Sequence, residues 1–572
     1  MYIETVPNRN SPPAILLREG WREGKKTLKR TLANLSHWPA QKIETLRRLL
    51  RDETLVSPQG LFTTQQTLPH GHVEALLAMI RKLGLDTLIS AQRCPERDLV
   101  VGMVVQRLIS PSSKLATTRE WHSTTLAEEL GVEEATEDDL YQALDWLLER
   151  QERIEKKLAA RHLTEGGLVL YDVSSSAYEG RTCPLVQFGH NRDGDKLPII
   201  VYGVITDGEG RPLAVEVYPG HTGDPTTVGD QVQKLRERFG LERVVLVGDR
   251  GMLTQPQLDK LQKHPGLGWI TALTSAAIRA LVQKGALQLS LLDEKNLAEI
   301  TSPDYPGERL VVCHNPLLGE ERRRKRQALL QATEKSLTKI AKEVGRRKNK
   351  PLKAAEIGLK MGKVLGHYKV GKHFDCEMGE GRFQWSRRQD SIEQEGKLDG
   401  IYVIRTSEAQ ERLSAEDSVR SYKSLAEVEH AFRCLKGIDL LVRPIRHRTA
   451  ERVPAHIFLC LLAYYVEWHL RRAWAPLLFE DEERLEERKR RDPILPAKPS
   501  ASAQAKKSSR QTAEGLPGHS FQTLLAELAS RARVTYELKS GDSKSTFKQA
   551  PEPTPLQARA YELLRLFPVA GK

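Results

Sequence analysis

The spacing of apolar residues predicts helices in the N-terminal region. Apolar side chains recur every three or four residues over 73–83, 99–108 and 140–147, as they do on the buried face of an amphipathic helix. The pattern predicts a helical N-terminal region over residues 1–165, which we interpret as a DNA-binding region. An ordinary helical domain is the alternative, because periodicity alone does not identify a helix-turn-helix.

The pattern changes after Gly167, where short apolar runs rich in strand-forming residues replace the helical spacing. Strands are predicted at 168–173, 198–206, 213–218, 244–247 and 269–273. One helix is predicted to start at Asp224, which can act as an N-cap before a proline, and another covers 255–262. Three strands followed by alternating helices and strands predict the first part of an α/β domain with a mixed sheet, over residues 166–275.

Residues 276–398 interrupt this alternation and are predicted to form an inserted basic segment. Within them, residues 321–350 hold twelve Lys and Arg against three Glu, a net charge of +9. Four apolar residues at helical spacing predict one buried face, formed by Leu330, Leu337, Ile340 and Val344. A basic amphipathic helix can bind DNA phosphates, and a solvated surface helix is the alternative. The candidate DNA contacts are Arg322, Arg323, Arg324, Lys325 and Arg326.

Residues 374–388, later in the same segment, contain the aromatic residues Phe374, Phe383 and Trp385 together with Arg387 and Arg388. Trp385 is the candidate DNA-binding residue among them. A core position is the favoured interpretation of this tryptophan. Stacking on a DNA base that has left its helix is the functional alternative.

Strand character returns at 400–404, and it is followed by a predicted helix over 414–436 and an apolar helix over 453–474. We assign residues 399–475 to the second part of the α/β domain. Residues 481–515 turn charged and then rich in Pro, Ser, Ala and Lys, which predicts a disordered linker. A short helix is predicted over 521–528, so residues 476–572 are expected to form a C-terminal linker and a short helical tail.

Length and charge narrow the class of protein. The 572 residues are too many for one domain and predict three or four. The net charge of +13 favours nucleic acid as a partner over an anionic membrane surface. The six cysteines form no C-x-x-C pair, which excludes a zinc ribbon and suits a reducing cytoplasm. The longest apolar run, 455–466, is too short to span a bilayer and predicts a buried helix.

Three carboxylates stand out by their positions. Asp172 lies in the first predicted strand, Asp249 follows the fourth, and Glu429 lies on the helix after the late strand. In a mixed sheet the first and fourth strands can be neighbours, and the late helix can bring Glu429 to the same point. A lone Asp at a strand end is more often a turn residue, so the argument depends on all three acids together. Clustered carboxylates repel one another unless cations neutralise them, and Mg²⁺ or Mn²⁺ suits such all-oxygen ligands.

The helix sequence Tyr422-Lys-Ser-Leu-Ala-Glu-Val-Glu429-His-Ala-Phe-Arg-Cys-Leu-Lys436 resembles a signature of bacterial insertion-sequence transposases of the DDE type. That signature is Y-x2-R-x3-E-x6-K, and Tyr422, Glu429 and Lys436 match it. Leu425 stands where the family has arginine, and Arg433 is a nearby cation that can supply the charge. The sequences around Asp172 and Asp249 and the tract 441–447 also resemble the family, so the resemblance covers about residues 165–475.

The seven-residue spacing has a geometric reason. Seven residues turn an α-helix through about 700°, close to two full turns, so Tyr422, Glu429 and Lys436 form one stripe. Glu427 lies roughly 160° around the helix from Glu429 and faces the other way. On this stripe Lys436 can bind a phosphate and Tyr422 can donate a hydrogen bond to one.

The resemblance implies a fold and a reaction. It implies an α/β fold with a ribonuclease H-like mixed sheet, interrupted by the inserted segment, in which Asp172, Asp249 and Glu429 hold two Mg²⁺ ions, with Mn²⁺ as a possible substitute. It also implies cleavage of transposon-end DNA and transfer of the 3′-hydroxyl to target DNA. The expected partners are terminal inverted repeats, target DNA and a second copy of the chain, in the bacterial cytoplasm and associated with the nucleoid. No membrane partner is expected.

Two alternatives stay open. One is a ribonuclease H-like nuclease or resolvase that cuts DNA without joining ends. The other is a non-catalytic DNA-binding protein derived from a transposase. ATP use is not expected, because the sequence has no G-x-x-x-x-G-K-[ST] phosphate loop.

Overall fold

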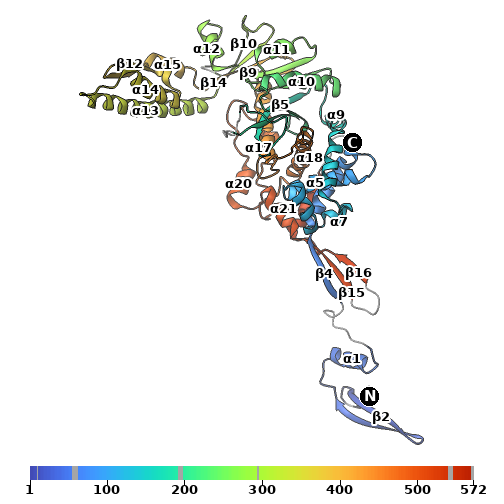
Figure 1. Cartoon of the computed structure of the whole chain (residues 1–572). Coiled ribbons are helices and arrows are strands. Elements are labelled where there is room, and N and C mark those ends of the chain that lie inside the picture. The colour runs from blue at the N-terminus through green and yellow to red at the C-terminus, as the bar shows by residue number, and fades with distance from the viewer. Residues whose placement is uncertain (10, 54–61, 191–196, 293–294, 539–544, 568–572) are drawn as a thin grey trace. The chain divides into compact units, whose positions relative to one another are not determined.

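The computed structural model describes residues 1–567 apart from 10, 54–61, 191–196, 293–294 and 539–544 (Figure 1). The chain divides into two compact units, not the three or four domains that its length predicts. The first unit is Met1–Leu68 with Ala532–Glu552, and the second is Pro69–Arg531 with Pro553–Lys572.

Strands dominate the first unit. One antiparallel sheet has the order β1 (Tyr2–Val6), β2 (Ala14–Glu23) and β3 (Lys26–Asn34), and helix α1 (Ala40–Leu49) follows it. A second sheet combines β4 (Phe62–Pro69), β15 (Ala532–Leu538) and β16 (Ser545–Gln549). The prediction of a helical N-terminal region is therefore wrong for residues 1–34 and for the strand over 62–69. The helical periodicity begins only at residue 73, and Gly24 adopts φ +60° at the β2–β3 turn, a conformation that favours a tight hairpin.

Helices follow between residues 71 and 162, as the apolar spacing predicts. The longest are α3 (Gly71–Leu83), α5 (Pro95–Ile109), α8 (Glu137–Leu148) and α9 (Gln151–His162). Four apolar residues of α8 are buried, namely Leu140, Ala143, Leu144 and Leu147. Helices α3, α5 and α8 pack against α18 (Arg452–Ala473) and share one hydrophobic core with the large sheet. The helical region is for this reason part of the second unit and not a separate domain.

An eight-stranded mixed sheet forms the centre of the second unit, in the order β10-β11-β14-β9-β8-β5-β6-β7. Its strands are β5 (Leu168–Ala177), β6 (Ile199–Asp207), β7 (Pro212–Pro219), β8 (Val244–Val247), β9 (Leu267–Ala272), β10 (Leu297–Ile300), β11 (Arg309–His314) and β14 (Ile401–Thr406). Strand β5 pairs antiparallel with β6 and parallel with β8, which pairs parallel with β9. The pairing of β5 with β8 confirms that the first and fourth predicted strands are neighbours.

The segment between β11 and β14 forms a subdomain with its own hydrophobic core. It consists of α13 (Pro316–Arg346), α14 (Ala354–Tyr368), β12 (Phe374–Gly379), β13 (Arg382–Arg387) and α15 (Gln389–Gly396). Figure 1 shows α13 and α14 side by side. The predicted start of the insertion at residue 276 is wrong, because β10 and β11 extend the large sheet. The predicted buried face of α13 is confirmed, since Leu330, Leu337, Ile340 and Val344 are all buried.

The helix predicted over 414–436 is two helices, α16 (Ala415–Lys423) and α17 (Leu425–Lys436), which meet at Ser424. Ser414 caps α16, because its hydroxyl accepts the backbone N–H of Asp417 at 3.0 Å. Helix α18 follows and is the one helix of the described residues that is long and apolar enough to cross a membrane. Its most apolar window is 94% buried inside the protein, which agrees with the predicted buried helix.

The C-terminal region contains helices where the composition predicts a disordered linker. These are α19 (Arg484–Arg490) and α20 (Ala501–Ser509); α21 (Phe521–Ala529) is the predicted short helix, and α22 (Pro555–Leu566) comes near the end. Contacts with distant residues explain the difference. The ammonium of buried Lys506 donates to the carbonyls of Ala475 and Leu478 at 2.8 and 2.9 Å. The side-chain amide of Asn315 donates to the carbonyl of Ile494 at 3.0 Å.

Candidate active site

Asp172 and Asp249 occupy matching positions on two neighbouring parallel strands. In the register of β5 and β8, Leu170 is paired with Val247. Asp172 lies two residues beyond Leu170, and Asp249 lies two residues beyond Val247. Neighbouring strands are about 4.8 Å apart, so the register brings the two aspartates to the same level of the sheet.

Local hydrogen bonds hold both aspartates. One carboxylate oxygen of Asp172, which is half-buried in β5, accepts the backbone N–H of Val173 at 2.8 Å. Asp249 is exposed just after β8 ends, and its Oδ1 accepts the backbone N–H of Met252 at 2.8 Å. Each carboxylate is therefore oriented by a backbone N–H that lies close to it in the sequence.

Glu429 shares a pocket with Asp172. The pocket has a volume of about 510 Å³ and lies between β5 and α17. It is lined by Asp172, Ser174, Glu429, Phe432, Arg433, Lys436, Gly437 and Arg443. Residues 257 positions apart in the sequence thus face one cavity, as the predicted convergence of the acids requires.

Tyr422 links the third carboxylate to this group. Burial raises the pKa of Tyr422, and the negative charges of Asp249 and Glu429 raise it further, while Arg250 opposes them. Both carboxylates must be near the phenol to act on it electrostatically. The structure thus brings Asp172 and Glu429 to one pocket and Asp249 to the neighbouring central strand, and Tyr422 is under the electrostatic influence of Asp249 and Glu429.

Glu427 faces the opposite side of α17, as the helix geometry predicts. Its carboxylate pairs with Arg484 and lies 3.8 Å from Arg488. It also packs beside Gly210, where an added Cβ would come within 2.5 Å of the Cβ of Glu427. Glu427 is a packing and ion-pairing residue, and Glu429 is the carboxylate that lines the pocket.

Two family models match the chain. Residues 187–466 match a transposase DDE domain, and residues 3–63 match the N-terminal domain of IS1634 family transposases. The chain belongs to the insertion-sequence DDE transposases. No curated protein matches it. The N-terminal match covers the strands β1 to β3 of the transposase, and the DDE match includes Asp249 and Glu429 but begins after Asp172.

Cations of the transposase surround the carboxylate pocket. Lys436, which lies on the same stripe as Glu429, and Arg433, which lies one turn after Glu429, both line it. Leu425, at the position where the resemblance has arginine, is partly buried against the main hydrophobic core. Sequence reasoning missed Arg443, which also lines the pocket. The one sequence feature that could have indicated Arg443 is its position in the tract 441–447. The resemblance to the family concerns this tract as a whole and does not single out Arg443.

The predicted DNA contacts on α13 differ in their surroundings. The guanidinium of Arg326 pairs with Asp399, at 2.8 Å between Nη1 and Oδ1, and its side chain is only 11% exposed. Arg326 therefore joins α13 to the chain before β14 and is poorly placed to meet DNA. Lys325 pairs with Glu321 at 2.5 Å on the surface. The other three predicted contacts, Arg322, Arg323 and Arg324, are exposed.

Trp385 is partly buried on β13. Its ring lies 5.9 Å from that of Phe374 in an edge-to-face arrangement and packs against the core of the inserted subdomain. Its surroundings favour the core interpretation of this residue. Its remaining exposed surface borders a shallow pocket with Asp375 and Gln384.

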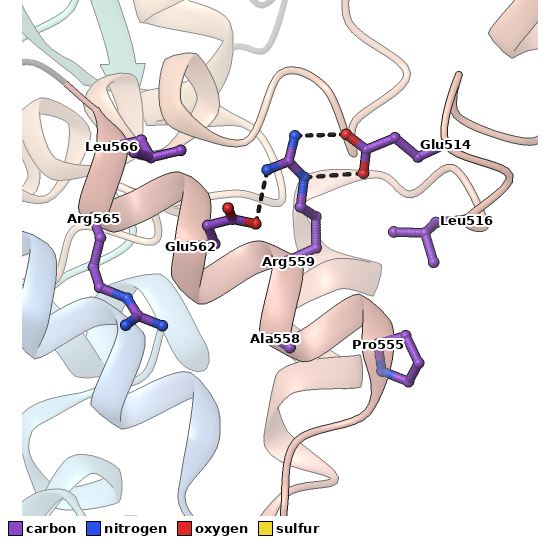
Figure 2. Close-up of a pocket in the computed structure, with 8 residues that line it drawn as sticks. All are labelled: Glu514, Leu516, Pro555, Ala558, Arg559, Glu562, Arg565 and Leu566. Atoms are coloured by element: carbon purple, nitrogen blue, oxygen red, sulfur yellow. Dashed lines mark hydrogen bonds and ion pairs between the residues drawn. The ribbon is translucent and has the colours of Figure 1, made fainter.

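A larger pocket beside α22 has no comparable chemistry. Its volume is about 740 Å³, and Figure 2 shows Arg559 at its centre, pointing toward Glu514 and Glu562. Arg559 donates to Glu514 through Nε at 2.9 Å and to Glu562 through Nη1 at 2.8 Å. The bonds to Glu514 tie α22 to the chain before α21, and the bond to Glu562 lies within α22.

A second group of possible metal ligands comes from α17, the chain that follows it, and α18. One ligand atom each from Cys434, Asp439 and Glu467 lies within 4.8 Å of the others. The guanidinium of Arg471 contacts Glu467 at 2.6 Å and Asp439 at 3.2 Å, so a cationic side chain already neutralises the acids. Burial raises the pKa of Glu467 to about 7. We assign this group a structural role.

Proposed function

We propose that this transposase cuts DNA at the ends of its element and joins the freed 3′-hydroxyl to target DNA, with Asp172, Asp249 and Glu429 as its catalytic carboxylates. The observation that supports the proposal best is the shared pocket of Asp172 and Glu429, together with the strand register that matches Asp172 with Asp249. In the first step water attacks a phosphodiester and releases a 3′-hydroxyl. In the second step that hydroxyl attacks a target phosphate and displaces a target 3′-oxygen.

The donor set fits two Mg²⁺ ions, with Mn²⁺ as a substitute. All three candidate ligands are carboxylates, which are the ligands that hard divalent cations prefer. Asp249 and Glu429 are exposed and Asp172 is half-buried, so DNA and water can reach them. Bound ions would lower the pKa of the attacking oxygen and stabilise the leaving one.

The side chains around the acids suit DNA phosphates. Lys436 and Arg433 line the pocket and can pair with the phosphates of the cut strand. Burial and the neighbouring carboxylates raise the pKa of Tyr422, so its hydroxyl stays protonated and can donate a hydrogen bond to a phosphate oxygen.

We further propose a ribonuclease H-like core for the part of the sheet that carries Asp172. Its support is the strand order from β7 to β9, in which β5 lies between an antiparallel hairpin and two parallel strands. In this view the large inserted subdomain after β11 and the strands β10 and β11 are additions to that core.

The remaining contacts with DNA follow from charge and from the family. The exposed arginines of α13 would hold phosphate backbones, and the N-terminal region would bind the terminal inverted repeats. We also propose that the transposase forms a homodimer that pairs two DNA ends. It would need neither ATP nor a membrane, and it would act in the bacterial cytoplasm, associated with the nucleoid.

The decisive test is cleavage of the element's own ends. Wild-type protein should cut a duplex carrying the terminal inverted repeat when Mg²⁺ is added, and Glu429→Gln should not. A second assay supplies ends that already carry a 3′-hydroxyl and measures their joining to plasmid DNA.

The outcomes separate the alternatives. Cleavage without joining would assign the chain to the nuclease or resolvase alternative. Binding of the repeat with neither reaction, in wild type as in Glu429→Gln, would favour a non-catalytic DNA-binding protein. The presence of Leu425 in place of the family's arginine is the sequence observation that favours the latter.

A further inference from the structure

The carboxylate pocket contains a cation that does not lie on helix α17. Two of its three basic residues, Arg433 and Lys436, lie on α17 with Glu429. The third, Arg443, lies on the irregular tract between α17 and α18 and faces the same cavity as Asp172. One of the three cations that line the pocket therefore comes from outside the helix.

The chain before Arg443 is fixed to two helices. The backbone N–H of buried Val442 donates to the carbonyl of Leu435 in α17 at 2.7 Å. The carbonyl of Val442 lies 2.9 Å from Nε2 of His456 in α18. The residue immediately before Arg443 therefore has both of its backbone polar groups bound.

The chain after Arg443 is fixed to the end of strand β5. Ile445 is fully buried, and its carbonyl accepts the backbone N–H of Glu179 at 3.0 Å. Ile445 also forms a parallel bridge with Tyr178, one residue beyond β5. Because β5 carries Asp172, the same strand positions both the carboxylate and the arginine.

We propose that Arg443 binds a phosphate of the DNA strand that is cut, and that this tract positions it as a fixed part of the substrate site. The inference rests on the proposed function of the pocket. A guanidinium presents a planar pair of N–H donors that matches two phosphate oxygens. A backbone that is bound on both sides does not need to be ordered when DNA binds, which lowers the entropic cost of the contact.

Arg446 provides a matched control. It lies three residues further along the same tract, is exposed, and pairs with Glu179 at 3.3 Å outside the pocket. Arg443→Gln and Arg446→Gln remove the same charge from the same segment. Only the first removes a cation from the carboxylate pocket.

The first measurement is binding of a duplex with the terminal inverted repeat, without divalent metal and at several salt concentrations. A plot of log affinity against log salt concentration has a negative slope, and the loss of one phosphate contact should make this slope less steep by about 0.9. We expect this change for Arg443→Gln and a smaller one for Arg446→Gln. An unchanged slope for Arg443→Gln would overturn the proposal, because a residue that only supports the fold does not alter the number of phosphates contacted.

The second measurement is Mg²⁺-dependent cleavage. Arg443→Gln should lower kcat/KM by about tenfold to a hundredfold, the usual range for a lost charged hydrogen bond, and Arg443→Lys should restore part of it. Equal losses in Arg443→Gln and Arg446→Gln would also overturn the proposal. If the wild-type protein cuts no DNA, the proposed function fails, whereas the metal-free binding slope still tests Arg443. A thermal unfolding midpoint for each variant shows whether it is folded.

Discussion

Glu427 and Glu429, two residues apart on α17, face different parts of the protein. Glu429 lines the pocket that contains Asp172, whereas Glu427 pairs with Arg484 on the other side of the helix. The two glutamates have the same chemistry and nearly the same sequence position. The turn of the helix alone assigns one of them to the candidate active site.

This pair gives a direct test of the site. Glu429→Gln removes a candidate metal ligand, so cleavage of terminal-repeat DNA should fall by at least about a hundredfold. Its stability should not fall, because the change removes one of several mutually repelling carboxylates. The measurements are single-turnover cleavage and urea unfolding.

Glu427→Gln is the matched control for that test. It should keep cleavage close to the wild-type level and lose at most about 1 kcal/mol of stability, since its partner Arg484 is largely exposed. Loss of cleavage in Glu427→Gln with retention in Glu429→Gln would reverse the assignment of the two residues.

A second prediction separates the structural arginine of α13 from its exposed neighbours. Arg326 and Asp399 form an ion pair with both side chains almost buried, and removing one partner of such a pair typically costs about 3–5 kcal/mol. Arg326→Ala should therefore destabilise the protein strongly. The double variant Arg323→Ala/Arg324→Ala should unfold like wild type yet bind DNA more weakly, with a lower salt slope.

Two results would contradict this prediction. If Arg326→Ala unfolds like wild type, the ion pair is not what joins α13 to the sheet. If the double variant binds DNA with the wild-type salt slope, this part of α13 does not contact phosphates.

Much of the sheet and the acidic residues of the site could be predicted from sequence because their signals are local. The apolar runs that form β5 and β8 are short and bounded by turns, and the placement of Glu429 and Lys436 on one face of α17 follows from helix geometry. The buried face of α13 could also be predicted from the sequence, because Leu330 and Leu337 are two helical turns apart and lie on the same face. These features depend on neighbours in the sequence and need no knowledge of distant contacts.

The errors arose where distant residues decide the structure. Strand β15 pairs with β4 across more than 460 residues, which no local pattern indicates. The polar composition of 481–515 predicts disorder. In the structure, however, the buried ammonium of Lys506 donates to the carbonyl of Ala475, just after the end of α18. Arg443 was missed for the same reason, since its place in the pocket depends on how its tract packs against β5 and α18.

Tyr422 gives a third prediction. Burial, with Asp249 and Glu429 nearby, raises the pKa of its phenol, so it should remain a hydrogen-bond donor throughout the neutral and mildly alkaline range. Tyr422→Phe should lower kcat/KM for cleavage by roughly tenfold, as expected for one hydrogen bond to a charged group. The shape of the activity profile between pH 7 and 9 should be the same in both proteins. A wild-type value of kcat/KM in Tyr422→Phe would exclude a phosphate contact by this hydroxyl.

The buried carboxyl of Glu467 predicts how stability depends on pH. Burial raises the pKa of Glu467 to about 7, while Arg471 opposes the shift. The folded protein then holds a proton that the unfolded chain releases near pH 4.5, so the contribution of Glu467 to stability falls as the pH rises from about 4.5 to 7 and is constant above that. The difference amounts to roughly 3 kcal/mol as an upper bound.

A comparison of wild type with Glu467→Gln isolates the contribution of Glu467 to the pH dependence of stability. The buried histidines are present in both proteins, so their contribution cancels in the difference. The free energy of unfolding of wild type minus that of Glu467→Gln, measured in urea between pH 4.5 and 8, should decrease through this window and then level off. A difference that is independent of pH would mean that Arg471 keeps Glu467 ionised in the folded protein. A difference that increases with pH would mean that the ion pair lowers the pKa of Glu467 below its value in the unfolded chain, and that pairing with Arg471 outweighs burial at this position.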